Sequence, residues 1–276
     1  MDTLYIVLLS LLYYDVGAVQ ITSLRVPPAV HNGTGSAAIL DCQYTLRPEE
    51  ASPDSGLVVK WFFNNGPTPV YQWIPSQKPQ ELGVLRGRLN LDYKASHHAS
   101  TMHRALYITN PTTELSGEYK CSVSTFNDED FMIKRMIVFA PEKSFEVVQT
   151  TIFNTVNITC RARGVYPEPK IALFKHSNGE EREQLQGVSV EISTRSGQYD
   201  ISATSLLDGD HLQSPTVFQC ELRIPHTTYA KKKNLVYYAG SLSSYSNSLS
   251  DCASTLSQSL PVIILLTLLN FCGYRF

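Results

Sequence analysis

Hydrophobic and polar side chains alternate in short runs along residues 38–139, which is the period of β-strands. In residues 38–42 the alternation places Leu40 and Cys42 on one face. In residues 58–63 it places Val59, Trp61 and Phe63 on one face and leaves Lys60 and Phe62 on the other. Similar runs occur at 69–74, 104–108, 115–121, 131–139 and 170–174. The pattern predicts an all-β chain.

Four residues with a characteristic order narrow the fold class: Cys42, Trp61, Tyr119 and Cys121. A Tyr two residues before a Cys is typical of the tyrosine corner of immunoglobulin sandwiches, whose hydroxyl bonds to the backbone just upstream. An earlier Cys followed by a Trp completes the pattern, although four unrelated residues in another β fold remain an alternative. The long interval between the two cysteines leaves room for two extra strands, which favours a variable-type domain over residues 19–139.

Residues 140–239 predict a second, smaller sandwich. No Trp follows its first Cys, so either Leu173 or Phe174 must fill that space. Phe218 stands where the corner Tyr would precede Cys220. The shorter interval favours a constant- or intermediate-type domain. The predicted fold class is therefore all-β, with two tandem immunoglobulin-like β-sandwiches, variable-type and then constant- or intermediate-type.

The first four of the six cysteines lie on strands that each sandwich brings together. We expect two intradomain disulfides, Cys42–Cys121 and Cys160–Cys220, which imply an oxidising compartment. No Cys-x-x-Cys occurs, so neither a zinc finger nor a thioredoxin site is supported. Cys252 is left without a partner.

The sequences at the two ends of the chain indicate segments that are cleaved or remain extended rather than parts of a folded domain. Residues 1–18 contain an apolar run of signal-peptide length, and cleavage is expected after Ala18. Residues 139–143 form a short linker containing a Pro, and residues 240–259 form a Ser-rich stalk.

The apolar tail, residues 260–276, is shorter than a membrane-spanning helix requires. Small residues, a polar spacer and an apolar tail together are typical of a GPI-attachment signal. Ser246 is the first choice for attachment and Asp251 the second. A short transmembrane helix and a soluble chain with an apolar end are the alternatives.

Composition and motifs favour a binding protein over an enzyme. The formal net charge of −2 over 276 residues gives no electrostatic reason to expect nucleic-acid binding. The sequence has no GxSxG elbow, phosphate loop or Cys/His dyad, so we expect no catalytic residue, no cofactor and no small-molecule substrate.

Two clusters of polar residues are interpreted as solvent-exposed surface rather than as ligand-binding sites. His97, His98 and His103 favour a solvated loop over a metal site. The basic run 231–233 favours a solvated strand edge over glycosaminoglycan or lipid contact.

Two sequons predict N-glycosylation at Asn32 and Asn157. Asn157 alternates with inward-facing neighbours and should face solvent. No usable sequon lies in residues 58–139, because Pro111 blocks Asn110. The face formed by this segment is expected to be free of glycan, as a protein-binding face should be.

Six segments resemble the Beaten path family of two-immunoglobulin-domain neuronal surface or secreted proteins: VKWFF (59–63), VYQWIP (70–75), RGRL (86–89), ITNP (108–111), LSGEYKC (115–121) and GVYPEP (164–169). The resemblance covers residues 24–238. It implies cell adhesion in axon guidance and synaptic partner choice, through binding of immunoglobulin-superfamily receptors of the Sidestep family by the first domain. The Ser-rich stalk and apolar tail replace the Cys-rich end of some members. Leu115 stands where an Asp usually pairs with an Arg, which argues against such a bridge from Arg88.

The expected partner-binding residues are Phe62, Tyr71, Trp73 and Lys120. Phe62 and Lys120 face outward by alternation, whereas the face of Tyr71 and Trp73 is not fixed by a cysteine. Exposed aromatics are the usual anchors of interfaces. The alternative is that Phe62 and Trp73 pack within the monomer, which would move the interface to the acidic residues 128–130 of the turn before residue 131.

The sequence therefore predicts a GPI-anchored glycoprotein on the extracellular face of the plasma membrane that binds a Sidestep-like receptor. The alternative is a freely secreted immunoglobulin-domain ligand, or an immune-type binding protein, without an anchor.

Overall fold

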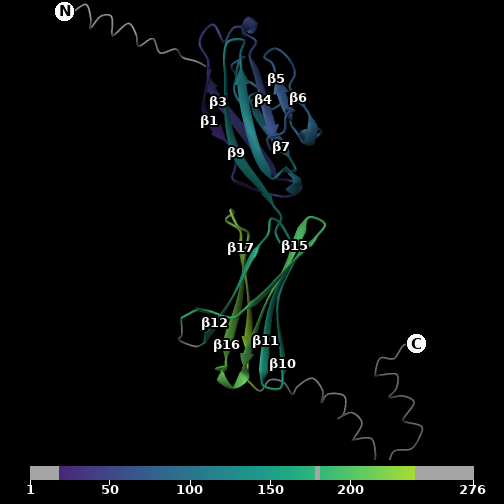
Figure 1. Cartoon of the computed structure of the whole chain (residues 1–276), viewed down its shortest axis with the longest axis vertical. Coiled ribbons are helices and arrows are strands. Elements are labelled where there is room, and N and C mark those ends of the chain that lie inside the picture. Colours follow the sequence, from purple (N-terminus) through teal and green to yellow (C-terminus); the bar gives the residue numbers. More distant parts are fainter. Residues whose placement is uncertain (1–18, 178–180, 240–276) are drawn as a thin grey trace, which may run out of the picture.

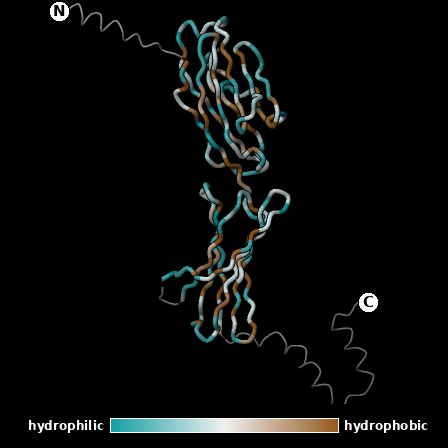
Figure 2. Tube along the Cα trace, in the orientation of Figure 1, coloured by the Kyte–Doolittle hydropathy of each residue, from teal (hydrophilic) through white to brown (hydrophobic). Residues whose placement is uncertain are grey.

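A computed structural model describes residues 19–177 and 181–239 (Figure 1). Two β-sandwiches follow one another along the chain, and hydrophobic and hydrophilic residues alternate along their strands (Figure 2). Within these described ranges, no helix has the length and apolar character needed to cross a bilayer. The predicted signal peptide, Ser-rich stalk and apolar tail, with Ser246, Asp251 and Cys252, lie outside the described residues.

The first sandwich contains two sheets, ordered β1-β3-β7 and β2-β9-β8-β4-β5-β6. Its strands are β1 (Gln20–Arg25), β2 (Ala29–His31), β3 (Ala37–Thr45), β4 (Val58–Phe63), β5 (Tyr71–Trp73), β6 (Gln80–Glu81), β7 (Ala105–Thr109), β8 (Gly117–Ser124) and β9 (Glu129–Phe139). Short 3-10 turns are η1 (Pro53–Ser55), η2 (Gly83–Leu85) and η3 (Thr113–Leu115). Because β5 and β6 extend the sheet beyond β4, the arrangement is that of a variable-type domain, as predicted.

The centre of this sandwich confirms the predicted tyrosine corner. The hydroxyl of Tyr119 donates to the carbonyl oxygen of Leu115 at 2.9 Å. Trp61 is fully buried against the Cys42–Cys121 disulfide, which is formed as predicted. Buried side chains alternate with more exposed ones on β4, and on β8 as far as Cys121, so Phe62 and Lys120 share an outer face; Ser122, the next outward residue of β8, is itself buried.

Two details differ from the sequence-based expectation. Strand β9 begins at Glu129 rather than at residue 131, because Glu129 and Asp130 already pair with Ser124 and Val123. Arg88 does form a bridge, with the carboxylate of Glu114 rather than with position 115. The Arg–acid pair is thus retained with its acid moved by one residue.

The second sandwich contains two four-stranded sheets, ordered β10-β11-β15-β14 and β13-β12-β16-β17. Its elements are β10 (Ser144–Ile152), β11 (Thr155–Val165), β12 (Lys170–Ser177), β13 (Glu183–Gln184), β14 (Ser189–Arg195), β15 (Gln198–Asp208), η4 (Gly209–His211), β16 (Thr216–Arg223) and β17 (Ala230–Tyr237). The order is that of a constant-type domain with the short strand β13 added.

The core of the second sandwich resolves the choice between Leu173 and Phe174. Leu173 is buried opposite Cys220, whereas Phe174 points to the outer face. Phe218 is fully buried in the place of the corner Tyr, and the Cys160–Cys220 disulfide is formed as predicted.

The junction between the sandwiches is packed rather than free. Ala140 and Tyr166 exchange two backbone hydrogen bonds of 2.8 and 3.0 Å. The ring of Phe139 lies 5.4 Å from that of His31 in the first sandwich and 5.9 Å from that of Tyr229 in the second. Phe139 therefore links the two units, which restricts how they turn relative to each other.

Candidate functional site

The outer face of the six-stranded sheet presents the best candidate for a binding surface. In the register of β4, β8 and β9, Lys120 stands opposite Phe62 on one side and Ile133 on the other. Phe131 is two residues before Ile133 and therefore on the same face. We call these four residues, Phe62, Lys120, Phe131 and Ile133, the aromatic face.

Lys120 lies between the two rings of the aromatic face. Its Nζ is 4.6 Å from the ring centroid of Phe62 and 5.3 Å from that of Phe131. Both distances are within the range of cation–π attraction, worth about 0.5–1 kcal/mol at an exposed site. The contact holds three side chains in one arrangement before any partner arrives, which lowers the entropy cost of binding.

Large apolar groups on this face remain open to solvent. Phe131 is 56 % exposed and Ile133 is 49 % exposed, while Phe62 is half-buried beneath the lysine. An ammonium group flanked by exposed aromatic and aliphatic surface combines the features enriched in interface anchors. The sequence predicted Phe62 and Lys120 as outward-facing; it did not identify Phe131 or Ile133.

The prediction that Tyr71 and Trp73 are exposed anchors is wrong. Both are only 2 % exposed, because β5 pairs Tyr71 with Trp61 and Trp73 with Val59, and paired residues share a face. The hydroxyl of Tyr71 donates to the carbonyl oxygen of His103 at 2.7 Å, and burial raises the pKa of this phenol. Trp73 packs against the His103 ring. Both side chains support the sheet from inside.

The acidic turn between β8 and β9, which the sequence offered as the alternative interface, makes mainly contacts within the sandwich. A carboxylate oxygen of Asp130 accepts from the backbone N–H of Ile21 at 2.7 Å. Glu129 accepts from the hydroxyl of buried Ser122 at 2.6 Å. Phe126, just before this turn, is 81 % exposed, and its ring covers Gly56 so closely that a Cβ there would lie 2.6 Å from it.

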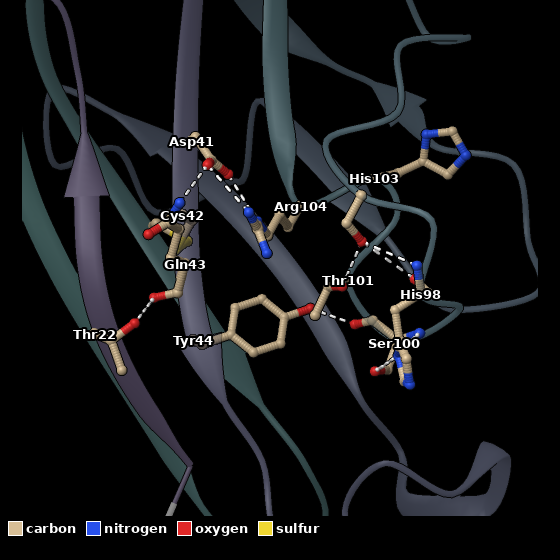
Figure 3. A network of polar contacts seen from close by, with 12 residues as sticks. Thr22, Asp41, Cys42, Gln43, Tyr44, His98, Ser100, Thr101, His103 and Arg104 are labelled. Atoms are coloured by element: carbon tan, nitrogen blue, oxygen red, sulfur yellow. Dashed lines mark hydrogen bonds and ion pairs between the residues drawn. A yellow bond between two sulfur atoms is a disulfide. The ribbon is translucent and has the colours of Figure 1, made fainter.

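The loop that contains His97, His98 and His103 is hydrogen-bonded to the core of the first sandwich. Figure 3 shows Tyr44 pointing from β3 to this loop, where its hydroxyl donates to the carbonyl oxygen of Ser100 at 2.6 Å. His98 Nδ1 lies 2.8 Å from the Ser100 hydroxyl, and His103 Nδ1 lies 2.9 Å from the carbonyl oxygen of Tyr93. In the part of the chain that the structure covers, no three His, Cys, Asp or Glu residues are grouped to hold a metal ion.

The basic run 231–233 lies on the edge strand β17, where alternation divides it between two sides. Lys231 pairs with Glu142 at 2.6 Å, and Lys233 donates to the carbonyl oxygen of Phe145 at 2.9 Å. Lys232, on the other side of the strand, lies 3.8 Å from the carboxylate of Glu221, so all three lysines have partners.

The two sequons lie away from the aromatic face. Asn32 follows β2, and its backbone N–H donates to the carbonyl oxygen of Phe139. Phe139 is six residues beyond Ile133 on β9, about 20 Å at ~3.3 Å per residue. Asn157 lies in the second sandwich and faces away from its buried neighbour Ile158.

Comparison with known proteins gives a likeness of fold. No family model matches the sequence, and a search of curated proteins finds no significant match. Bovine butyrophilin is similar with a TM-score of 0.59 and 19 % identity, covering 78 % of this chain and 98 % of that one. The ectodomain (Ig1–Ig3) of mouse nectin-like molecule 4 has a TM-score of 0.49 and 13 % identity, covering 77 % and 66 %. The extracellular portion of mouse CD200RLa has a TM-score of 0.46 and 15 % identity, covering 75 % and 96 %.

The topology, the two disulfides and the likeness to butyrophilin agree on one fold. The chain consists of two tandem immunoglobulin-like sandwiches, the first variable-type and the second constant-type. Disulfides of this kind form in oxidising compartments, which places the folded part of the chain outside the cytosol.

Proposed function

We propose that this protein is a cell-surface recognition protein that binds another immunoglobulin-superfamily protein through the aromatic face of its first sandwich. The observation that carries the proposal is Lys120 held between Phe62 and Phe131, with Phe131 and Ile133 about half exposed. A tandem immunoglobulin ectodomain needs a partner-facing surface, and this one is preorganised and distant from both sequons.

The partner we propose is a Sidestep-like receptor, and the role is axon guidance and synaptic partner choice. Support comes from the sequence resemblance to the Beaten path family, which includes the segments carrying Phe62 and Lys120. Only these two of the four predicted partner-binding residues remain in the proposal, joined by Phe131 and Ile133.

We further propose the processing predicted from the sequence. The mature chain begins after Ala18, carries glycans at Asn32 and Asn157, and is held to the outer membrane surface by a GPI anchor at Ser246 or Asp251. If the protein is GPI-anchored, phosphatidylinositol-specific phospholipase should release it from the cell surface. If it is freely secreted, it should already be in the medium, and the enzyme should release no more.

The test of the proposed interface is binding of a soluble Sidestep-like ectodomain to cells displaying the full chain. Phe131→Ala should weaken binding by about 2 kcal/mol, roughly thirtyfold, with surface display unchanged. Phe153→Ala is the matched control, because Phe153 is an exposed phenylalanine of the second sandwich. Equal binding by both variants would place the interface elsewhere.

A further inference from the structure

Strand β14 is an unprotected edge of the second sandwich. It ends the sheet β10-β11-β15-β14 and, among the described residues, pairs only with β15, so the N–H and C=O groups of its other side have no strand partner there. Among described strands longer than two residues, β14 alone has every residue exposed. It contains no Lys, Pro or bulge, and its two charges, Glu191 and Arg195, are of opposite sign, so two copies of the strand need not repel each other.

The other three edge strands of this sandwich differ from β14 in charge, length or exposure. Strand β17 carries the three lysines of the run 231–233. Lys233 of β17 also donates to the backbone of the other long edge strand, β10, at Phe145. The fourth edge strand, β13, has two residues. Strand β14 thus differs from β17 in having no lysine, from β13 in its length, and from β10 in having every residue exposed.

Strand β14 also leaves core-facing apolar groups uncovered. Val190 and Ile192 pair with buried Ala203 and Ile201 and therefore point to the inner side of the sheet, yet they are 48 % and 44 % exposed. The edge strand of the facing sheet is the two-residue β13, which is too short to cover a seven-residue strand.

The charges of β14 indicate what occupies this edge. Glu191, Ser193 and Arg195 alternate on its outer face, and no salt-bridge partner within the described residues is found for either charge. If a second β14 runs antiparallel with Ser193 opposite Ser193, Glu191 of each copy stands opposite Arg195 of the other. Moving the centre to Glu191 would instead oppose two like charges. Only the Ser193-centred register makes two opposite-charge pairs.

We propose that two copies of this protein associate by pairing their β14 strands antiparallel about Ser193. The added strand pairing satisfies the free backbone groups of both edges. On the inner side, Ile192 comes to lie opposite Thr194 of the second copy, which adds cover to the apolar residues. The predicted glycan at Asn157 does not block this edge. Asn157 pairs with Leu206 of β15, whereas β14 begins at Ser189, which pairs with Thr204. The pairing is independent of the aromatic face of the first sandwich.

The first test uses a single cysteine in the full chain. In a Ser193→Cys dimer, the two introduced thiols, one from each copy, stand opposite each other at a distance suited to a disulfide. A covalent dimer should therefore appear on a non-reducing gel. Ser189→Cys is the control, because this position faces Gly197 of the second copy in the same register. The unsubstituted chain measures any background from Cys252 and Cys272. No dimer above the control with Ser193→Cys would overturn the register.

The second test reverses charges and mixes variants. Glu191→Arg alone and Arg195→Glu alone each create two like-charge pairs, so co-precipitation of two differently tagged full chains should fall about tenfold or more. Mixing the two single variants restores opposite pairs at both positions, so the heterodimer should form as the parent does. Association that the single reversals leave unchanged, or that mixing fails to restore, would overturn the proposal.

Discussion

The sheet that contains β4 and β8 in the first sandwich corresponds to the sheet that contains β12 and β16 in the second. In both, a cation lies over a phenylalanine ring on the outer face, but the neighbours of that cation differ. In the first sandwich, Trp61 stands opposite Cys121 and Phe62 is the next residue. The Phe62 ring lies under Lys120, for which no salt bridge is found within the described residues. In the second, Phe174 occupies the corresponding place opposite Gln219, and the guanidinium of Arg182 lies 3.4 Å above its ring.

The two sheets differ in what their carboxylate contacts: Glu129 of the first accepts from the Ser122 hydroxyl, whereas Glu221 of the second pairs with cations. Glu221 is 3 % exposed and pairs with Arg182 at 2.5 Å, with Arg223, and with Lys232 at 3.8 Å. The corresponding position after the cysteine in the first sandwich is the neutral Ser122. The second sheet therefore satisfies its cations internally, while the first leaves Lys120 available to a partner.

The largest expected effect tests how each core is filled. Trp61→Ala should lower the free energy of unfolding by about 3–5 kcal/mol, because it leaves a cavity the size of an indole beside the disulfide. Leu173→Ala, at the corresponding place of the second sandwich, removes a smaller side chain and should cost about 2–4 kcal/mol. Urea titration of both variants measures the difference, and a larger loss for Leu173→Ala would reverse the comparison.

A smaller effect is expected from Glu221→Gln. The amide cannot neutralise the cations around it, so unfolding of the second sandwich should become easier by about 2 kcal/mol near neutral pH. The Arg182 guanidinium holds the pKa of Glu221 below its usual value, which means the carboxylate stabilises above its unfolded pKa.

This stabilisation disappears as pH falls from about 4.3 through the lowered folded pKa of Glu221. Melting temperatures across that window should fall more steeply for the parent than for Glu221→Gln. Parallel curves would mean that other carboxylates dominate the acid sensitivity.

The smallest effect concerns the tyrosine corner. Tyr119→Phe removes the hydroxyl that bonds to Leu115 and copies the residue that the second sandwich has at position 218. We expect a loss of about 1 kcal/mol in the free energy of unfolding, the usual net worth of one hydrogen bond. A melting temperature identical to that of the parent would show that the first sandwich does not depend on its corner.

Much of the fold and half of the predicted site could be read from the sequence. The cysteines, Trp61 and Tyr119 fix the inward face of β4 and β8, and with it the outward positions of Phe62 and Lys120. No such marker fixes β5, so only its pairing with β4 shows that Tyr71 and Trp73 point inward.

The remaining surface features depend on connections between strands. Phe131 and Ile133 were missed because their side of β9 depends on how tightly the turn after β8 closes. The exposed edge at β14 depends on the length of the facing strand β13, which alternation within β14 does not reveal.

The most direct test of the central claim compares equivalent positions of the two sheets in one binding experiment. Cells displaying Lys120→Glu, Phe62→Ala, Gln219→Glu or Phe174→Ala are titrated with the soluble Sidestep-like ectodomain, after equal display of folded protein is confirmed. We predict that the two first-sandwich variants weaken binding about tenfold or more, while the two second-sandwich variants bind as the parent does. Equal affinity for all four, or losses confined to Gln219→Glu and Phe174→Ala, would contradict it.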